Sequence, residues 1–338
     1  MAFGSGRSLG VMLVGRDAAA HAAVRAQAAE RAGFDSLWVI EDYFQTGAFA
    51  LAGAAAAVTS RIGLGIGVVN PHTRHPALLA MEASTLAGVA PGRVTLGLGT
   101  GVRRWIEHQM ALPQPRPFAT LQDCVDVVRR LWAGERVSRE GEDFALRDVA
   151  LEYKPAQPEL PIVLGVKGPR GLALAGRIAD GALCSILSSP AHVRRVRETT
   201  AAARRAAGRT GPFPILAYVP VAIDRDVNAA RRAVRPLLAH YLAHLHGQPI
   251  LAEAGVSESE TLAIRAARAA GESGAALVAE HHVDTFALAG DADHVRSRLG
   301  EWLDAGLDTP IAVPVGADVT EQIGRIGAAI GPWLRERA

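Results

Sequence analysis

The chain has 338 residues, of which 49% are hydrophobic, so it can bury a large core and is not a disordered protein. Its formal net charge is +2 and its basic residues form no continuous block, which excludes a nucleic-acid footprint.

Short apolar runs alternate with longer amphipathic segments along the chain. The runs predict eight strands, at residues 9–14, 36–40, 62–69, 94–98, 161–166, 181–186, 213–223 and 310–315. The segments between them predict helices at 18–32, 49–59, 77–89, 117–132, 169–178, 191–207, 226–246, 293–305 and 319–335, the last with a break near Gly331 and Pro332. Eight strands alternating with helices favour an α/β fold closed as a (β/α)8 TIM barrel.

Two segments interrupt the alternation within this single predicted domain, residues 1–338. Residues 134–159, after the fourth strand and its helix, contain short β-like runs, and we expect an insertion that acts as a lid. Residues 247–282, after the seventh strand and its helix, are Ala-rich and predict a helical insertion.

The most unusual turn follows the third strand, at residues 67–76. It places five polar residues and two prolines directly after a Gly-rich strand, and in TIM barrels the chemistry lies at this end of the strands. Gly65 and Gly67 would let a flat ligand approach the backbone. The alternative is a sharp turn that happens to be polar.

A second candidate turn joins the fifth strand to a helix. It contains Gly165, Val166, Lys167 and Gly168, and Lys167 is one of only two lysines in the chain. Free N–H groups at a helix start can hold a phosphate. The alternative is an ordinary strand-to-helix turn.

Several segments, in one order, resemble the bacterial-luciferase-like oxidoreductases. The strongest is residues 67–76, and residues 38–42, 92–101 and 178–181 support it. The nearest branch in this resemblance is the deazaflavin group that includes methylenetetrahydromethanopterin reductase.

The resemblance implies a barrel that binds coenzyme F420 or, in sister groups, FMN. It implies a cis peptide bond between Gly67 and Val68 that presses on the central ring of the coenzyme, and a homodimer. The cofactor contacts expected from the two turns and the resemblance are Gly67, Val68, Asn70, Arg74, Thr100, Gly165, Val166, Lys167, Gly168, Cys184 and Ser185.

The identity of the proton donor is not settled by the sequence, because the chain departs from the motifs of the family that it resembles. Val102 stands where an acidic residue often follows the fourth strand, and the run after the second strand is Glu41-Asp42-Tyr43 rather than Asp-His. We expect Glu41, Asp42 or His75 to take the catalytic role, with Glu107 and His108 as neighbouring candidates.

The resulting hypothesis is an F420-dependent oxidoreductase that transfers hydride between the deazaflavin and a small organic substrate. The alternatives are a reduced-FMN monooxygenase and a cofactor-free barrel that acts as a binding protein. His240, His244 and His246 have helical spacing but no evident carboxylate partner, so we expect no metal site.

The sequence also predicts a compartment. No apolar run has transmembrane length, and residues 1–8 lack the apolar centre of a signal peptide. The two cysteines, Cys124 and Cys184, lie far apart, which excludes a disulfide framework and fits the reducing cytoplasm. We therefore expect a cytoplasmic protein without a membrane partner.

Overall fold

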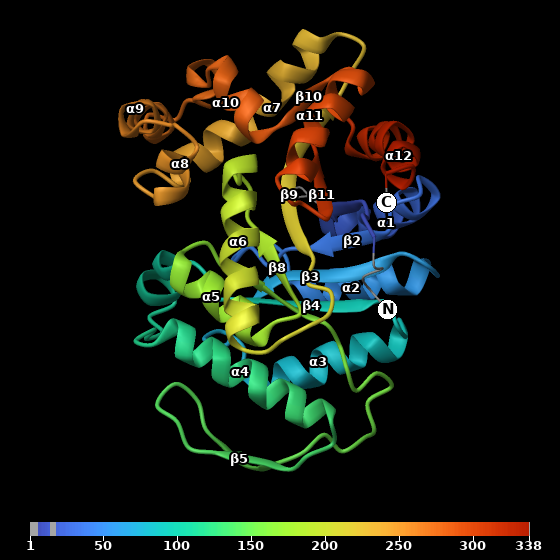
Figure 1. Ribbon diagram of the computed structural model, residues 1–338, viewed down its shortest axis with the longest axis vertical. Helices are drawn as coiled ribbons and strands as arrows, with labels where there is room; N and C mark the ends of the chain where they lie inside the picture. Colours follow the sequence, from blue (N-terminus) through green and yellow to red (C-terminus); the bar gives the residue numbers. More distant parts are fainter. Residues whose placement is uncertain (1–5, 14–17, 338) are drawn as a thin grey trace.

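The structure is a computed structural model that describes residues 6–13 and 18–337. Eight parallel strands close into a barrel in the order β1-β2-β3-β4-β7-β8-β9-β11, and β11 pairs with β1 (Figure 1). These strands are β1 (Gly10–Leu13), β2 (Ser36–Val39), β3 (Gly63–Val69), β4 (Val94–Gly99), β7 (Ile162–Gly165), β8 (Gly181–Cys184), β9 (Ile215–Ile223) and β11 (Thr309–Pro314). The predicted TIM barrel is confirmed.

Helices surround the barrel because the apolar face of each one packs on the strands. They are α1 (Ala18–Arg31), α2 (Ala48–Val58), α3 (Pro76–Val89), α4 (Pro117–Trp132), α5 (Pro169–Ile178), α6 (Pro190–Ala206), α7 (Val227–His244), α11 (Ala292–Asp304) and α12 (Val319–Arg335). The break expected near Gly331 is wrong, because α12 continues through Pro332. Val14, the predicted end of the first strand, lies outside the described residues.

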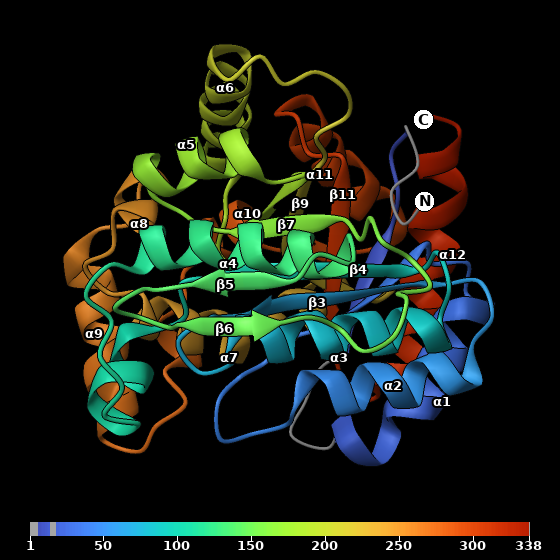
Figure 2. The same ribbon diagram turned by 90° about the horizontal axis from the view of Figure 1, so that it is seen from below.

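The segment 134–159 forms an antiparallel hairpin of β5 (Val137–Arg139) and β6 (Leu146–Val149). Figure 2 shows this hairpin across the outer side of α3 and α4. The segment that follows α7 contains α8 (Pro249–Glu253), α9 (Glu258–Ala269), the 3-10 turn η2 (Ala275–Leu277) and α10 (Glu280–Phe286). Two short elements were not predicted: the π-helix η1 (Arg104–Gln109), and β10 (Leu288–Gly290), which pairs with β9.

Aspartates close the amino-terminal rim of the barrel in a repeated way. Asp35 precedes β2 and accepts a hydrogen bond from the backbone N–H of Leu9, at 2.7 Å. Asp180 precedes β8 and accepts one from Ile162, at 3.0 Å. Asp308 precedes β11 and accepts one from Ile215, at 2.7 Å. Each carboxylate therefore ties the start of its own strand to the start of a neighbouring strand.

Within the described residues, no helix is both long and apolar enough to cross a membrane.

Candidate active site

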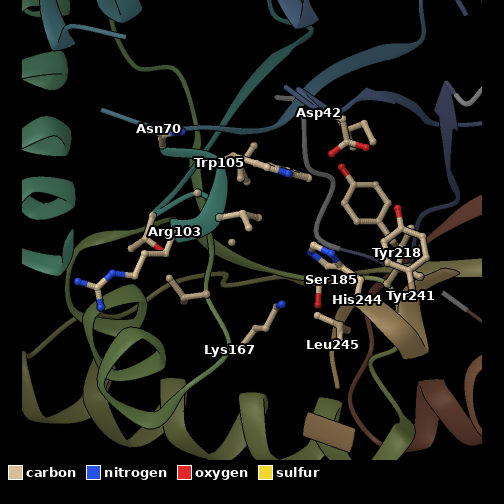
Figure 3. Close-up of a pocket in the computed structure, with 18 of the residues that line it drawn as sticks. Asp42, Asn70, Arg103, Trp105, Lys167, Ser185, Tyr218, Tyr241, His244 and Leu245 are labelled. Carbon is tan, nitrogen blue, oxygen red and sulfur yellow. The ribbon is translucent and has the colours of Figure 1, made fainter. Parts of the chain in front are cut away.

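A cavity of about 750 Å³ opens at the carboxyl ends of the barrel strands. Its walls come from the turns after β2, β3, β4, β7 and β8, from β9, and from the end of α7 with the residues that follow it (Figure 3). Small-molecule and cofactor sites have volumes of roughly 300–1,000 Å³, and TIM barrels place their chemistry at this end. The cavity is therefore the candidate active site.

Most of the residues expected at the site line this cavity. They are Glu41, Asp42, Gly67, Val68, Asn70, Thr100, Gly165, Val166, Lys167, Gly168 and Ser185, and Val102 lies in the same lining. Arg74, His75 and Cys184 are outside the lining. The turns were thus well placed by the sequence, whereas the directions of individual side chains were not.

The peptide bond between Gly67 and Val68 is cis, as the family resemblance implies. Tyr218 donates a hydrogen bond from its hydroxyl to the carbonyl oxygen of Gly67, at 2.9 Å. Gly67, Val68 and Tyr218 all line the cavity. The backbone of Gly67 and the side chain of Val68 therefore form the floor of the cavity, and the hydrogen bond from Tyr218 holds this floor in place.

Glycines on the barrel strands make room for neighbouring protein groups. A Cβ atom on Gly99 or Gly165 would stand 2.8 Å from a methyl carbon of Val68, so Val68 sits in a slot between β4 and β7. A Cβ on Gly65 would collide with the indole of Trp38, and one on Gly67 with the hydroxyl of Tyr218. Gly65 therefore makes room for Trp38 and lies outside the cavity lining, whereas Gly67 makes room for Tyr218 and still lines the cavity with its backbone.

Asn70 holds the turn after β3 together. Its buried side chain accepts hydrogen bonds from the backbone N–H groups of His72 and Thr73, at 3.0 and 3.1 Å, and donates one to the hydroxyl of Tyr43. Each polar atom of the Asn70 amide is engaged within the protein, so its contribution to the site is the shape of the turn.

Arg74 points to Glu41, away from the cavity. Its guanidinium donates two hydrogen bonds to the Glu41 carboxylate, both 2.8 Å, and a third to Glu82, also 2.8 Å. The bonds to Glu41 are the main reason that the pKa of Arg74 is raised. Both oxygens of the Glu41 carboxylate are therefore engaged by Arg74.

His75 and Cys184 also lie away from the cavity. His75 is the N-cap of α3, where its Nδ1 accepts a hydrogen bond from the backbone N–H of Ala77 at 3.2 Å. Its Nε2 lies 3.2 Å from the carbonyl oxygen of Ala145 in the hairpin. Cys184 is buried in β8, and burial raises the pKa of its thiol to about 12. The geometry supports neither the catalytic role expected for His75 nor the cofactor contact expected for Cys184.

Asp42 is an acidic lining residue whose carboxyl group has no ion-pair partner among the described residues. Burial raises its pKa. Figure 3 shows it on the same side of the cavity as Tyr218 and Tyr241. Burial, Tyr241 and Asp42 raise the pKa of Tyr218, and burial and Asp42 raise the pKa of Tyr241. Asp42 therefore keeps its proton to a higher pH than a free aspartate.

The turn after β7 has the features of an anion site. Gly168 is the N-cap of α5 and supplies no side-chain cap, so the first N–H groups of this ten-residue helix face a ligand or solvent. Ser185, in the neighbouring turn after β8, lines the cavity, and its buried Oγ has no hydrogen-bond partner. Burial lowers the pKa of Lys167, whose Nζ donates a 3.4 Å hydrogen bond to Gln248.

Among the lining residues that sequence reasoning missed are Tyr218, Tyr241, His244, Gln248 and Arg265. Tyr218 had a usable signal, because it carries the only hydroxyl in the apolar run of β9. His244 was considered only as a metal ligand, and its ring instead stacks on Trp105 with centroids 5.8 Å apart. Gln248 and Arg265 lie in the inserted helices, where no motif marks them.

The lid expected at residues 134–159 has no support from the geometry of the described residues. No residue of this segment lines the cavity, and its hairpin contacts the starts of α3 and α4 instead. The helical segment after α7 does contribute, through Gln248 and Arg265.

One group among the described residues has the composition of a metal site: Glu260, His281 and His282. The Nδ1 of His282 accepts a hydrogen bond from the backbone N–H of Ala279, at 3.1 Å. A neutral imidazole with an accepting Nδ1 carries its proton on Nε2, which then has no lone pair for a metal. This Nε2 lies 3.3 Å from a carboxylate oxygen of Glu260, so the contact joins α10 to α9.

Comparisons with known proteins agree with this fold and site. The sequence profile of the family described as luciferase-like monooxygenase matches residues 4–309. The chain is 32% identical over 317 residues to 5,10-methylenetetrahydromethanopterin reductase of Archaeoglobus fulgidus, covering 91% of this chain and 93% of the relative. It is 31% identical over 327 residues to a putative coenzyme F420-dependent oxidoreductase of Mycobacterium tuberculosis, covering 90% and 92%.

A solved structure is similar over nearly the whole chain. It is the coenzyme F420-dependent tetrahydromethanopterin reductase from Methanopyrus kandleri, with a TM-score of 0.90, 27% sequence identity, and coverage of 98% of this chain and 100% of that one. The barrel, the cis turn after β3 and the profile match lead to one conclusion: this chain belongs to the luciferase-like monooxygenase family.

Proposed function

We propose that this protein is a coenzyme F420-dependent oxidoreductase that transfers hydride between the deazaflavin and a small organic substrate. The observation that carries the proposal is the cavity with the Gly67–Val68 turn in its floor and an uncapped helix start beside it. Two relatives that match nine-tenths of the chain are named for reactions of this kind. None of these relatives supports the alternative of a cofactor-free binding protein.

The residues present fit such a cofactor. The orphaned Oγ of Ser185 and the uncapped start of α5 would hold its phosphate, together with the backbone of Gly165, Val166 and Gly168. Gly67 and Val68 would support the ring system from below. When bound, the deazaflavin supplies the hydride donor or acceptor, and the protein supplies binding and orientation.

We assign the proton-donating role to Asp42. It lines the cavity, and its pKa is raised by burial, which suits a general acid. Glu41 is occupied by Arg74, and His75 lies outside the cavity. The Asp42→Asn variant should bind the cofactor normally and lose about 10²–10⁴-fold in turnover.

Anaerobic titration with purified coenzyme F420 tests the proposal. We expect saturable quenching of deazaflavin fluorescence with a Kd well below about 1 mM. The Ser185→Ala variant should bind more weakly, whereas Ser259→Ala, an exposed serine on α9, should bind like the unmodified protein. Absence of binding below the millimolar range would remove the deazaflavin assignment.

A reduced-FMN monooxygenase is the second candidate, because the matching family is described as luciferase-like monooxygenase. The two candidates differ in their need for oxygen. A monooxygenase consumes oxygen when reduced FMN and substrate are supplied together, and a deazaflavin oxidoreductase does not. An oxygen electrode with both cofactors therefore separates them.

We also propose that the protein is a cytoplasmic homodimer. Both cysteines are buried and free, as suits a reducing compartment. Leu78, Met81 and Val89 are exposed apolar side chains of α3. Light scattering should give twice the chain mass, and Met81→Glu should give the mass of one chain.

A further inference from the structure

The segment between β4 and α4 forms one wall of the candidate active site. It contains the π-helix η1, and four consecutive residues of the segment, Val102, Arg103, Arg104 and Trp105, line the cavity. π-helices are rare, and they occur frequently at functional sites. This wall therefore differs in kind from the rigid strand ends that surround the rest of the cavity.

The segment is held together mainly by its own hydrogen bonds. Among the described residues, the hydrogen bonds of residues 101–112 all end within the stretch between β4 and α4. Arg103 is paired with Glu107, and the side chain of Gln114 donates to the carbonyl oxygen of Thr100. The segment can therefore move as a unit without breaking a hydrogen bond to the barrel.

Both ends of this unit have left-handed backbone. Gly101 has a φ of 71° and Ala111 a φ of 54°, and alanine rarely adopts this conformation. A Cβ atom on Gly101 would stand 2.5 Å from the Cδ1 of Ile106 and 2.8 Å from the Nδ2 of Asn70. The observed position of η1 therefore requires glycine at 101, and the two ends are suited to absorb the backbone change of a moving loop.

Trp105 is the side chain that connects η1 to other walls of the cavity. Its indole meets the ring of Tyr43, after β2, edge to face with centroids 5.8 Å apart, and it stacks on His244 of α7, also at 5.8 Å. Figure 3 shows this indole extending toward the side of the cavity that holds Asp42 and His244. Each ring contact of this kind favours the observed arrangement by roughly 2- to 12-fold.

We propose that residues 101–112 are a gate of the active site and that Trp105 is the residue that holds the gate closed. The gate opens when the indole leaves Tyr43 and His244. Closed, it keeps water away from Asp42 and from the ligands in the cavity. The inference rests on the proposed function for what the gate admits, a coenzyme and its substrate, whereas the opening itself is a property of the protein alone.

The first test uses the protein without cofactor and the two lysines of the chain as probes. Lys167 lines the cavity, whereas Lys154 is exposed and lies outside the lining. Sulfosuccinimidyl acetate acetylates both lysines, and mass spectrometry follows each rate, with Lys154 as the internal standard. In Trp105→Ala, Lys167 should react about 10-fold faster and Lys154 at an unchanged rate. Trp105→Phe keeps a ring at this position and should have a smaller effect.

A second variant separates a gate from a fixed wall, because removal of the indole also widens the cavity. Gly101→Ala leaves Trp105 in place but disfavours the closed position of η1, since its methyl meets Ile106 and Asn70. It should also speed the acetylation of Lys167. Backbone amides of residues 101–112 should exchange with deuterium about 10-fold faster in both variants.

Trp333→Ala is the matched control, because it removes a half-buried indole of α12 that lies outside the cavity lining. It should change neither the acetylation of Lys167 nor the exchange of residues 101–112. Faster acetylation in Trp105→Ala alone, with unchanged amide exchange, would make the segment a fixed wall and would overturn the proposal. Unchanged acetylation in both Trp105→Ala and Gly101→Ala would overturn it as well.

A second arm uses coenzyme F420 and stopped-flow fluorescence. A gate is a barrier that is crossed in both directions, so Trp105→Ala should raise the association and dissociation rate constants together, by about 10-fold, and leave Kd within about 3-fold. Faster dissociation alone, with weaker binding, would make Trp105 a direct contact of the cofactor and would refute the gate. Failure of F420 to bind at all would sink the proposed function, while the acetylation and exchange results would still decide the gate.

Discussion

Two adjacent acidic residues have opposite environments, and this difference selects the proton donor. Glu41 faces Arg74 and is held by two charged hydrogen bonds, whereas Asp42 faces the cavity and two tyrosines. The sequence presented both as equal candidates. Only the direction of each side chain separates an ion-pair partner from an acid with a raised pKa.

The raised pKa of Asp42 also makes a prediction about stability. The folded protein holds this proton more tightly than the unfolded chain, so ionisation destabilises the fold as pH rises through the folded-state pKa. Asp42→Asn removes that penalty. Its melting temperature should exceed that of the unmodified protein by about 2 °C at pH 8, with the difference vanishing below about pH 4.

Calorimetry across this pH range provides the check. Asp304→Asn, at an exposed position at the end of α11, is the control. A lower melting temperature for Asp42→Asn at pH 8 would mean that the carboxylate is stabilised in the folded state.

The slot that holds Val68 gives a second prediction. Gly165→Ala places a methyl 2.8 Å from a Val68 methyl and should cost about 1–3 kcal/mol of unfolding free energy, measured with urea. In a Val68→Ala background the cost should shrink. Gly300→Ala, in α11 with open space around its Cβ, should instead stabilise by about 0.5–1 kcal/mol. Additive effects of Gly165→Ala and Val68→Ala would contradict the slot.

Among the elements, the helices after α7 matter most for the site because they add Gln248 and Arg265 to it. They are fastened at two points. The carboxylate of Glu253 in α8 lies 3.0 Å from the Nδ1 of His192 and forms a 2.9 Å ion pair with Arg195, both in α6. Gln248 bonds to Lys167 in the turn after β7. The two lining residues of this segment are therefore positioned by contacts with α6 and with the turn after β7.

Loss of the first fastening should loosen α8 locally. In Glu253→Gln, backbone amides of residues 249–256 should exchange with deuterium about 10-fold faster, because charged hydrogen bonds to Arg195 and His192 are weakened. Glu258→Gln, an exposed position on α9, serves as the control. Unchanged exchange would show that apolar packing of Ile250 and Leu251 alone holds the helix.

Element positions followed from the sequence where burial is complete. The nine residues of β9 are all buried, so their apolar run marks the strand clearly. The helices that pack on the barrel were marked by their apolar faces. The residues of the site were predictable as far as they follow strand ends. The side-chain directions of Arg74 and His75 could not be predicted, because their partners, Glu82 and Ala145, belong to other elements. Arg265 enters the site from α9, in a segment whose position depends on such distant contacts.

At the scale of the whole molecule, the three rim aspartates are the clearest recurring device. Asp308 receives the Ile215 N–H and an ion pair from Arg197. Asp308→Asn should lower the free energy of unfolding by about 1.5–3 kcal/mol, the usual contribution of hydrogen bonds to charged groups. Denaturant unfolding measures this, with the exposed Asp304→Asn as a control expected to stay within about 0.5 kcal/mol.

Cofactor affinity of folded Asp308→Asn should be unchanged, because the cavity lies at the other end of the strands. A matched loss of affinity and stability would show that the two ends of the barrel are coupled.

These aspartates also bear on how the protein could be redesigned. They hold the strand ends at the amino-terminal rim, whereas the turns that would determine substrate specificity lie at the carboxyl-terminal rim. A library that randomises the turns after β4 and β7 and the helices after α7 would therefore leave the rim contacts intact. Substrate specificity could in this way be changed while the fold of the barrel is kept.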